Sequence, residues 1–264
     1  MCGIVGYIGK SSAPRALVNG LRRLEYRGYD SAGMAVLEGG SVVVSKAPGK
    51  VAALDEKARS EWPRERFSDS RIGIAHTRWA THGPPTEVNA HPHLDQTGGI
   101  ALVHNGIIEN YRALRSRLEA QGHEFHSETD TEVLAHLIGE CDRGDLFQAV
   151  CDALHQVEGT YGVAVISAGE PGRIITARRG SPIVIGVGED ETIVASDAAA
   201  IISHTRQVIY LEDNDIAVVT ADGVEIRDLD RVPVTREIAE RGFDAEAAEK
   251  GGLFSSIKRL LGGG

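Results

Sequence analysis

Short runs with β character recur along most of the chain, and they limit the possible folds more than any other feature. Helical periodicity is confined to four places, around residues 18–24, 114–118, 133–138 and 147–154. Because these helices cluster instead of alternating with strands, the sequence predicts an α+β protein, arranged as a sandwich with helices outside. The predicted strands are Gly3–Ile8, Ala32–Leu37, Ser41–Ser45, Arg71–His76, Ile100–His104, Tyr161–Ser167, Ile174–Ala177, Ile183–Val187, Thr192–Ala195, Val208–Leu211 and Ile216–Thr220.

The composition is that of an ordinary globular protein. Of the 264 residues, 42% are hydrophobic and 25% are charged, which excludes disordered and fibrous classes and suits one large domain or two small ones. The 38 Asp and Glu residues outnumber the 28 Lys and Arg residues, and the formal net charge is −10. Nucleic-acid binders usually show the opposite balance, so we expect no nucleic-acid partner.

Nothing in the sequence predicts export or membrane insertion. No segment approaches the ~18 uninterrupted apolar residues that cross a bilayer, and the apolar run Cys2–Ile8 lacks the basic region and the length of a signal peptide. The three cysteines leave one unpaired in any intramolecular disulfide scheme, so we expect reduced thiols. The sequence therefore predicts a cytoplasmic protein in which Cys141 and Cys151 are small core residues.

Residues 253–264 differ from the rest of the chain. They contain Lys258 and Arg259, no acidic residue, and apolar residues at helical spacing. Such an amphipathic piece could touch a membrane surface or a partner, but a helix this short is only marginally stable in water. We therefore expect no membrane contact and interpret the segment as an atypical, stray or engineered tail.

Cys2 directly follows the initiator methionine and is the most informative single residue. Removal of Met1 would leave a residue with both a thiol and a free α-amine, whose reference pKa is about 8. A nucleophile and a base matched to neutral pH would then share one residue, as in the N-terminal nucleophile enzymes. With Met1 retained, the same nitrogen is an amide and accepts no proton. Taken alone, Cys2 is better explained as an apolar residue that opens a strand.

A second cluster combines His76–Gly83 with Asn89–His93. The Arg78 guanidinium, beside a threonine hydroxyl, could hold a ligand carboxylate through two hydrogen bonds. The four histidines also suggest a metal site, but their spacing is irregular and no cysteine is near in sequence, so we predict no metal. A rigid, hydrogen-bonded loop is the simpler interpretation of His91-Pro92-His93.

Two further polar clusters follow. Asn105 and Gly106 stand at the end of the predicted strand Ile100–His104, and Asn-Gly usually forms a tight hairpin turn. The Asn105 amide and the Gly106 N–H could at the same time serve as two donors for an oxyanion. Ser127–Glu132 is an acidic helix start that the helix dipole favours, and Asp130 could pair there with a ligand ammonium group.

Two glycine-containing segments fail as cofactor motifs. Gly9-Lys10-Ser11 ends like a phosphate-binding loop, but Ile4 stands where that motif needs its first glycine. Gly186-Val187-Gly188 lacks the remaining glycine of a dinucleotide-binding motif. We therefore expect no nucleotide and no other cofactor.

Six separated segments, in fixed order, resemble the glutaminase domain of the glucosamine-6-phosphate synthases, which are class II glutamine amidotransferases. The Cys-Gly-Ile start alone indicates only the broader class, whereas Tyr-Arg-Gly-Tyr-Asp and His-Thr-Arg-Trp-Ala-Thr-His-Gly indicate this member. The resemblance runs from residue 2 to about residue 252. Its segments are Cys2–Gly6, Glu25–Gly33, His76–Gly83, Asn89–His93, His104–Asn110 and Ser127–Glu132.

The resemblance implies the four-layer αββα sandwich of the N-terminal nucleophile hydrolases. It implies that Cys2 is the nucleophile with its own amine as base, and that Asn105 and Gly106 form the oxyanion hole. Arg27 would help to orient the N-terminus, and His91 would have a supporting role. The residues that would hold or line the glutamine site are Arg78, Trp79, Thr81, His82 and Asp130.

The implied reaction is hydrolysis of the L-glutamine side-chain amide to glutamate and ammonia through a thioester on Cys2. In the family, the ammonia aminates fructose 6-phosphate in a second, sugar-isomerising domain, a step of amino-sugar (hexosamine) biosynthesis. We expect residues 2–240 to form the glutaminase domain and residues 241–252 to resemble the linker. We expect this chain to lack the isomerase domain, and fructose 6-phosphate to be a partner only together with that domain.

Alternatives stay open at the level of the sequence. The chain could be a free-standing glutaminase, or another class II amidotransferase that aminates a phosphoribosyl group or aspartate. It could also be a non-catalytic binding module of the same fold, or a metal-dependent hydrolase built on the histidines. Labelling of Cys2 by a glutamine-like alkylating agent, with no effect of chelators, would separate an amidotransferase from the last two.

Overall fold

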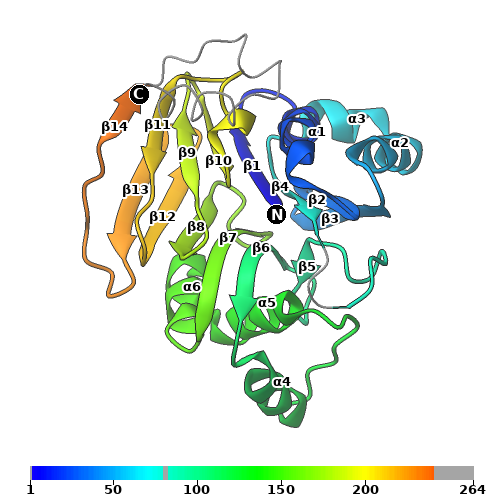
Figure 1. Ribbon diagram of the computed structural model, residues 1–264, viewed down its shortest axis with the longest axis vertical. Helices are drawn as coiled ribbons and strands as arrows, with labels where there is room; N and C mark the ends of the chain where they lie inside the picture. Colours follow the sequence, from blue (N-terminus) through cyan, green and yellow to red (C-terminus); the bar gives the residue numbers. More distant parts are fainter. Residues whose placement is uncertain (1, 80–82, 241–264) are drawn as a thin grey trace, which may run out of the picture.

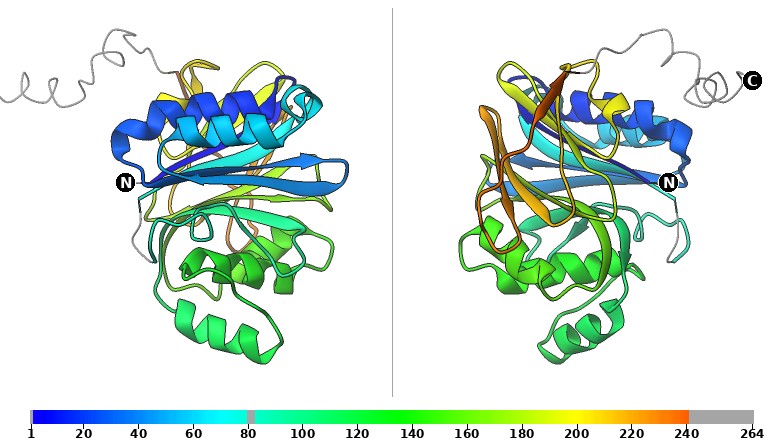
Figure 2. Two further views of the ribbon diagram at one scale, coloured as in Figure 1. Left: turned by 90° about the vertical axis from the view of Figure 1, so that its right-hand side faces the viewer. Right: turned by 60° about the vertical axis from the view of Figure 1, so that its left-hand side comes forward.

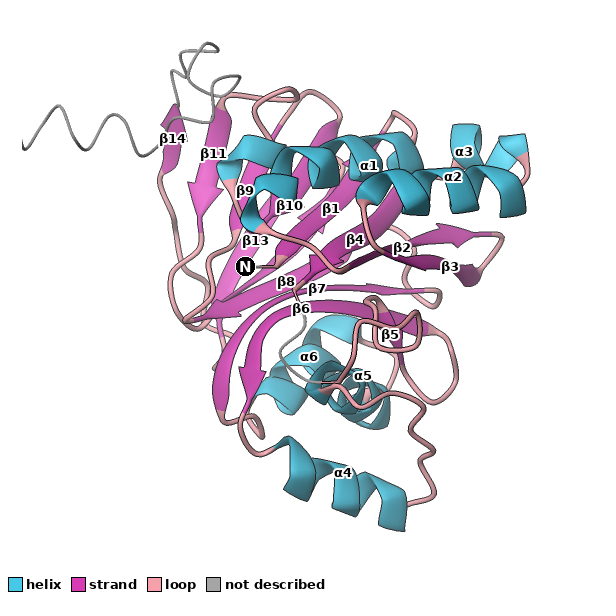
Figure 3. Cartoon of the chain, turned by 45° about the vertical axis from the view of Figure 1, so that its right-hand side comes forward, coloured by secondary structure: helices cyan, strands magenta, loops and turns pink. Residues whose placement is uncertain are grey.

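Alternating inward and outward side chains along the strands produce two antiparallel sheets that pack face to face. The computed structural model describes residues 2–79 and 83–240, and within them helices cover the outer face of each sheet (Figures 1 and 2). Figure 3 shows the N-terminal helices on one sheet and the mid-chain helices on the other. The predicted α+β fold, a four-layer αββα sandwich, is confirmed.

The larger sheet contains the N-terminal strand in its interior. In the described part of the chain it has eight strands: β1 (Gly3–Gly9), β2 (Ser31–Glu38), β3 (Ser41–Pro48), β4 (Ile72–Arg78), β9 (Val184–Val187), β10 (Glu191–Ala195), β11 (Gln207–Tyr210) and β14 (Ile238–Glu240). Their spatial order is β14-β11-β9-β10-β1-β4-β2-β3. The start of β1 therefore lies beside the end of β4, with Gly3 paired to Thr77.

The smaller sheet contributes the facing wall. Among the described residues it has six strands: β5 (His93–Leu94), β6 (Ile100–Ile108), β7 (Gly159–Ser167), β8 (Ile174–Arg179), β12 (Asp215–Thr220) and β13 (Gly223–Asp228), in the order β13-β12-β8-β7-β6-β5. The sequence did not predict β5, β13 or β14. Each is short or polar, and each pairs with a strand that the sequence did predict: β5 with β6, β13 with β12 and β14 with β11.

The outer layers are built from amphipathic helices. On the larger sheet lie α1 (Ala13–Leu24), α2 (Val51–Glu61) and α3 (Arg64–Asp69), and on the smaller sheet lie α5 (Asp130–Cys141) and α6 (Leu146–Leu154), with α4 (Tyr111–Ala120) against α5. Short 3₁₀ turns span Glu25–Arg27 and Ala198–Ala200. The sequence predicted α1, α4, α5 and α6 but not α2 and α3.

Local capping explains where α1 and α5 begin. The Ser12 hydroxyl accepts a hydrogen bond from the Arg15 N–H at 3.4 Å, and Pro14 occupies the first turn of α1, where no donor is needed. At α5, the Thr129 hydroxyl accepts from the Glu132 N–H at 3.3 Å. Thr129 is therefore the N-cap, and the next residue, Asp130, is the first of the helix.

The sheets enclose an apolar layer that includes Ile4, Ile74 and Val103, all fully buried. Cys151 is fully buried in the second core, under the mid-chain helices, as predicted, whereas Cys141 is only partly buried at its edge. None of the described helices is both long and apolar enough to span a bilayer. The predicted linker and tail, residues 241–264, lie outside the described residues.

Candidate active site

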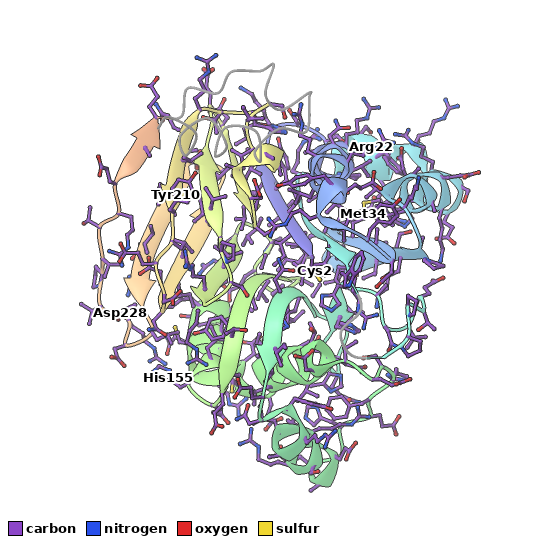
Figure 4. All side chains as sticks on the ribbon, in the orientation of Figure 1. Cys2, Arg22, Met34, His155, Tyr210 and Asp228 are labelled. Carbon is purple, nitrogen blue, oxygen red and sulfur yellow. The ribbon has the colours of Figure 1, made fainter. Side chains whose placement is uncertain are left out.

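Cys2 lies just before β1, between the two sheets and near the middle of the molecule in Figure 4. The Trp79 N–H donates to the Cys2 Sγ at 3.2 Å, and the Sγ lies 3.6 Å from the Trp79 carbonyl oxygen, to which the thiol donates. Burial raises the pKa of the Cys2 thiol, while the Trp79 N–H opposes that rise because it favours the thiolate. The thiol is thus held at a defined position where β1 and β4 meet.

A pocket of about 300 Å³ opens beside Cys2 and brings together most of the residues predicted from the sequence. Thr81 and His82, two of the predicted glutamine-binding residues, lie outside the described residues. Ile107, Thr160, Ser181 and Pro182 also line the pocket, and no sequence motif predicted a role for them. The predicted residues that line it are Cys2, Arg27, Arg78, Trp79, His91, Asn105, Gly106 and Asp130.

Asn105 and Gly106 do not form the expected hairpin turn. Strand β6 continues to Ile108, and Gly106 pairs with Tyr161 of β7. The φ of Gly106 is +131°, and a Cβ there would collide with the Thr160 carbonyl oxygen, so only glycine fits. Pairing with β7 overrides the turn preference of Asn-Gly, and both residues reach the pocket from within a strand.

The Asn105 side chain connects the two sheets. Its Nδ2 donates to the Cys2 carbonyl oxygen at 3.4 Å, and its Oδ1 lies 2.9 Å from His76 Nε2 on β4. A carboxamide N–H is therefore directed toward the residue that carries the thiol. Together with Gly106 in the same pocket wall, this side chain has the chemistry of an oxyanion-binding donor.

Arg78 is the last residue of β4 and supplies a buried positive charge to the pocket wall. Its side chain donates to the Gly83 and Pro84 carbonyl oxygens, each at 3.3 Å, and the residue is only 4% exposed. The Asn89 side chain donates to the same Pro84 oxygen at 3.0 Å. These bonds hold the planar guanidinium in one orientation, which suits recognition of a carboxylate.

Asp130 supplies a buried negative charge at the start of α5. Its Oδ2 accepts a hydrogen bond from the Ile108 N–H at 2.8 Å, and the Thr131 hydroxyl lies 3.5 Å from its Oδ1. The first bond ties the helix start to the end of β6. The pocket therefore presents a carboxylate and a guanidinium from different elements, a pair that matches the two charged groups of an α-amino acid.

The Arg27 side chain is held in place by hydrogen bonds to Ser196 and Asp197. Its Nη1 lies 3.1 Å from Asp197 Oδ2 and 3.4 Å from the Ser196 carbonyl oxygen, while the Tyr26 hydroxyl donates to the same Asp197 oxygen at 2.8 Å. The Ser196 hydroxyl in turn accepts from the Ile4 N–H at 3.0 Å. Arg27 thereby connects to the start of β1 through Ser196, and no local sequence signal identified Ser196 or Asp197.

Trp79 follows β4 and forms part of the rim. It is 54% exposed, and its ring lies so close to Gly28 that a Cβ there would collide with it. The φ of Gly28 is +99°, so glycine is required at this position for both conformation and space. The Tyr-Arg-Gly-Tyr-Asp segment thus packs directly against the tryptophan beside Cys2.

The buried histidines form a neutral cluster in and behind the pocket wall, which His91 and His104 line. The His76 and His91 rings stack with their centroids 4.2 Å apart. The backbone N–H of His104 donates to His91 Nδ1 at 3.4 Å, and His93 Nε2 lies 3.0 Å from the Thr129 hydroxyl. Burial lowers the pKa of His76 to about 3 and holds the pKa values of His91 and His93 well below the usual range. Across residues 2–79 and 83–240, no three His, Cys, Asp or Glu side chains are grouped so that they could hold a metal ion.

The chain matches a family of known proteins along most of its length. A family model described as a glutamine amidotransferase domain matches residues 58–232. Curated relatives include the isomerizing glutamine-fructose-6-phosphate aminotransferases of Chlorobaculum tepidum, 50% identical over 257 residues, and of Thermus thermophilus, 53% identical over 253 residues. Each alignment covers 96% of this chain and 41% of the relative, so the chain spans about two fifths of the length of these relatives.

A solved structure agrees with the sequence comparisons. The glutamine phosphoribosylpyrophosphate amidotransferase from B. subtilis, determined in complex with ADP and GMP, superposes with a TM-score of 0.71 and 28% identity over 86% of this chain and 49% of that chain. The fold, the motif order and the family model therefore agree, and the chain belongs to the glutamine amidotransferase family.

Proposed function

We propose that this chain hydrolyses the side-chain amide of L-glutamine, with Cys2 as the nucleophile. The observation that carries the proposal is the meeting of Cys2, Asn105 and Gly106 in one pocket. A thiol and two oxyanion donors, brought together from facing sheets, are the minimum set for acyl transfer through a thioester. Membership of the amidotransferase family supports glutamine as the donor of the amide.

The reaction proceeds through a thioester on Cys2. The Cys2 thiolate attacks the glutamine Cδ, and the Asn105 Nδ2 and the Gly106 N–H donate to the oxyanion that forms. The leaving amide nitrogen takes a proton and departs as ammonia, which leaves a γ-glutamyl thioester. Water then attacks the thioester and releases glutamate and the thiol.

The substrate's charged groups would be held by the buried pair described above. Arg78 would bind the α-carboxylate, and Asp130 would bind the α-ammonium group. Trp79 would line the site, and Thr81 and His82 are further binding residues predicted from the resemblance alone. Arg27 would act on the start of β1 through Ser196, and His91 would support the wall through its stack on His76.

The proton transfers are assigned to the α-amine of Cys2, which requires removal of Met1. An α-amine has a reference pKa of about 8 and can accept a proton from the thiol near neutral pH. The amide nitrogen that remains when Met1 is retained cannot do so. Intact-mass measurement of the active protein should therefore show the loss of one methionine, and full activity with Met1 in place would contradict the assignment of the base.

The acceptor of the ammonia is a separate proposal, supported by the names of the relatives. They are aminotransferases for fructose 6-phosphate, and this chain corresponds to 41% of their length. We propose that residues 2–240 are the glutaminase domain of such an enzyme and that amination of fructose 6-phosphate requires the part of the relatives that the chain does not match. A cytoplasmic location is part of this proposal.

The test uses the 264-residue chain, L-glutamine and an electrophilic diazoketone analogue of glutamine. We expect glutamate and ammonia to form in equal amounts, the analogue to block the reaction, and peptide mapping to find it on Cys2. A chelator should leave the rate unchanged, and fructose 6-phosphate should give no amino sugar. Glutamine binding without glutamate release would indicate a binding module, and inhibition by the chelator would indicate a metal-dependent hydrolase. Formation of an amino sugar would contradict the proposal that amination requires the part of the relatives that this chain does not match.

A further inference from the structure

His76 stands behind the pocket wall and contacts the residue that would bind the oxyanion. It lies on β4 of the larger sheet, it is fully buried, and its Nε2 is 2.9 Å from Asn105 Oδ1 on β6 of the smaller sheet. The pocket itself is lined by Asn105. His76 does not line the pocket, so it would act on a bound substrate through its two neighbours in the wall, Asn105 by a hydrogen bond and His91 by the ring stack.

The two ends of the Asn105 amide are not equivalent for catalysis. Only the NH₂ end can donate to an oxyanion, whereas an oxygen in its place would repel the developing charge. In the observed orientation Nδ2 donates to the Cys2 carbonyl oxygen at 3.4 Å and Oδ1 faces His76. Exchange of the two ends would place Oδ1 against the Cys2 carbonyl oxygen, and two acceptors would then face each other.

We propose that His76 is a positioning residue for glutamine hydrolysis, which donates its Nε2–H to Asn105 Oδ1 and so keeps the Asn105 NH₂ directed toward Cys2 and the reacting carbonyl. The inference rests on the proposed function of Asn105 as an oxyanion donor. It adds an orienting group for that donor, supplied by the sheet that also carries the nucleophile.

The surroundings of His76 favour the tautomer that this role needs. Asn105 Oδ1 can only accept a hydrogen bond, so its 2.9 Å contact with Nε2 requires the proton on Nε2. The stack on His91 at 4.2 Å holds the plane of the ring. Burial also lowers the pKa of His76 to about 3, so the ring is neutral at physiological pH and keeps one N–H.

A double-mutant cycle on glutamine hydrolysis tests the inference. We expect His76→Leu to lower kcat by about 10-fold or more while KM changes by less than about 3-fold, by analogy with the groups that orient metal ligands, whose loss typically costs about 10–100-fold. In the Asn105→Ala background, His76→Leu should lower kcat by no more than about 2-fold, because the group that it orients is already gone. If the fold-decrease in kcat of the double variant equals the product of the fold-decreases of the two single variants, the two residues act independently and the inference is overturned.

Two further variants separate positioning from general damage to the core. His76→Gln retains an N–H donor on a side chain of similar reach and should recover kcat to within about 5-fold of the wild type. His136→Leu removes another buried imidazole, on α5 and outside the pocket, and should leave kcat unchanged even if it lowers the melting temperature. An equal loss of kcat in His76→Gln and His76→Leu would contradict the orienting role.

A measurement on the unmutated protein keeps the inference testable if His76→Leu fails to fold. Nitrogen-15 NMR of the His76 ring should show the neutral Nε2–H tautomer from pH 5 to pH 8, and an Nδ1–H tautomer would overturn the inference. The outcome is separate from that of the proposed function. If the wild type releases no glutamate, the proposed function fails, whereas an active wild type with multiplicative losses or the wrong tautomer removes only the role of His76.

Discussion

The space between the sheets has an apolar end and a polar end, and the same three strands build both. The apolar end is buried, whereas the polar end opens into the pocket, where Cys2 and Asn105 are partly exposed. The inward side chains are Ile8, Ile4 and Cys2 along β1 and its start, Ile72, Ile74, His76 and Arg78 along β4, and Ala101, Val103 and Asn105 along β6.

The comparison shows how strand register builds a site. Side chains alternate between the two faces of a strand, so a slip of one residue would exchange every inward side chain for an outward one. The pairing of Gly3 with Thr77 on β4 sets where Cys2 stands relative to Arg78. The apolar end stabilises the register by packing, whereas each polar group at the other end requires a partner because an unpaired buried donor or acceptor costs about 1–3 kcal/mol.

Removal of the Cys2 thiol should cause the largest loss of activity with almost no loss of stability, which would show that the polar end serves catalysis and not folding. We expect Cys2→Ala to lower glutamate release by more than about 10³-fold, because the nucleophile is lost. The free energy of unfolding should change by less than about 1 kcal/mol, because a small, partly exposed side chain is shortened by one atom. Cys2→Ser should keep at most a trace of activity, since a hydroxyl is a poorer nucleophile. An alanine variant with near wild-type turnover would end the proposal.

Removal of Asn105, the proposed oxyanion donor, is expected to have the next largest effect. Asn105→Ala should lower kcat by about 10²-fold or more with a smaller change in KM, because one oxyanion donor contributes about 3 kcal/mol in the transition state. Steady-state kinetics with glutamine measure both constants. A rise in KM with unchanged kcat would instead assign Asn105 to ground-state binding.

Replacement of Arg78 by lysine should weaken glutamine binding more than it slows the chemical step. Arg78→Lys keeps the positive charge but loses the planar fork that donates to the Gly83 and Pro84 carbonyl oxygens. We expect KM for glutamine to rise by about 10-fold and kcat to fall by less. If Arg78→Lys lowers kcat more than it raises KM while Asn105→Ala does the reverse, the two roles have been exchanged.

The smallest effect should come from the apolar end. Ile74→Val removes one buried methylene from the layer between the sheets, where Ile74 is fully buried. We expect the free energy of unfolding to fall by about 1 kcal/mol and kcat to remain within about 2-fold of the wild type. Chemical denaturation and glutamate release give the two values. A loss of kcat far beyond 2-fold would show that packing at the apolar end also positions the polar one.

Local sequence patterns predicted the regular elements where periodicity is strong. The apolar strands and the helices at residues 13–24, 111–120, 130–141 and 146–154 were found, with ends that differ by several residues. The helix Val51–Glu61 was missed because its apolar positions are few among charged ones. Asn105-Gly106 was placed in a turn because the dipeptide preference is local, whereas the pairing with Gly162 and Tyr161 is not.

The candidate site was predicted in its main residues and missed in its supports. Ordered motifs identified the residues with evident chemistry, from Cys2 to Asp130. Ser196 and Asp197 support Arg27 and the start of β1, but they lie more than 160 residues away in sequence and stand in no motif. His76 was part of a recognised motif, yet its contact with Asn105 depends on the packing of one sheet on the other.

The sequence by itself determined the types of the strongly periodic elements, the order of the motifs and the chemical groups available, because period-2 and period-3.6 patterns and residue identity are local properties. Tertiary structure alone decided that a thiol, an amide and a guanidinium share one pocket, and that Asn105 points its NH₂ end at Cys2. It also decided that His76 is neutral. Desolvation and hydrogen-bond geometry depend on neighbours from the facing sheet, and no local pattern encodes them.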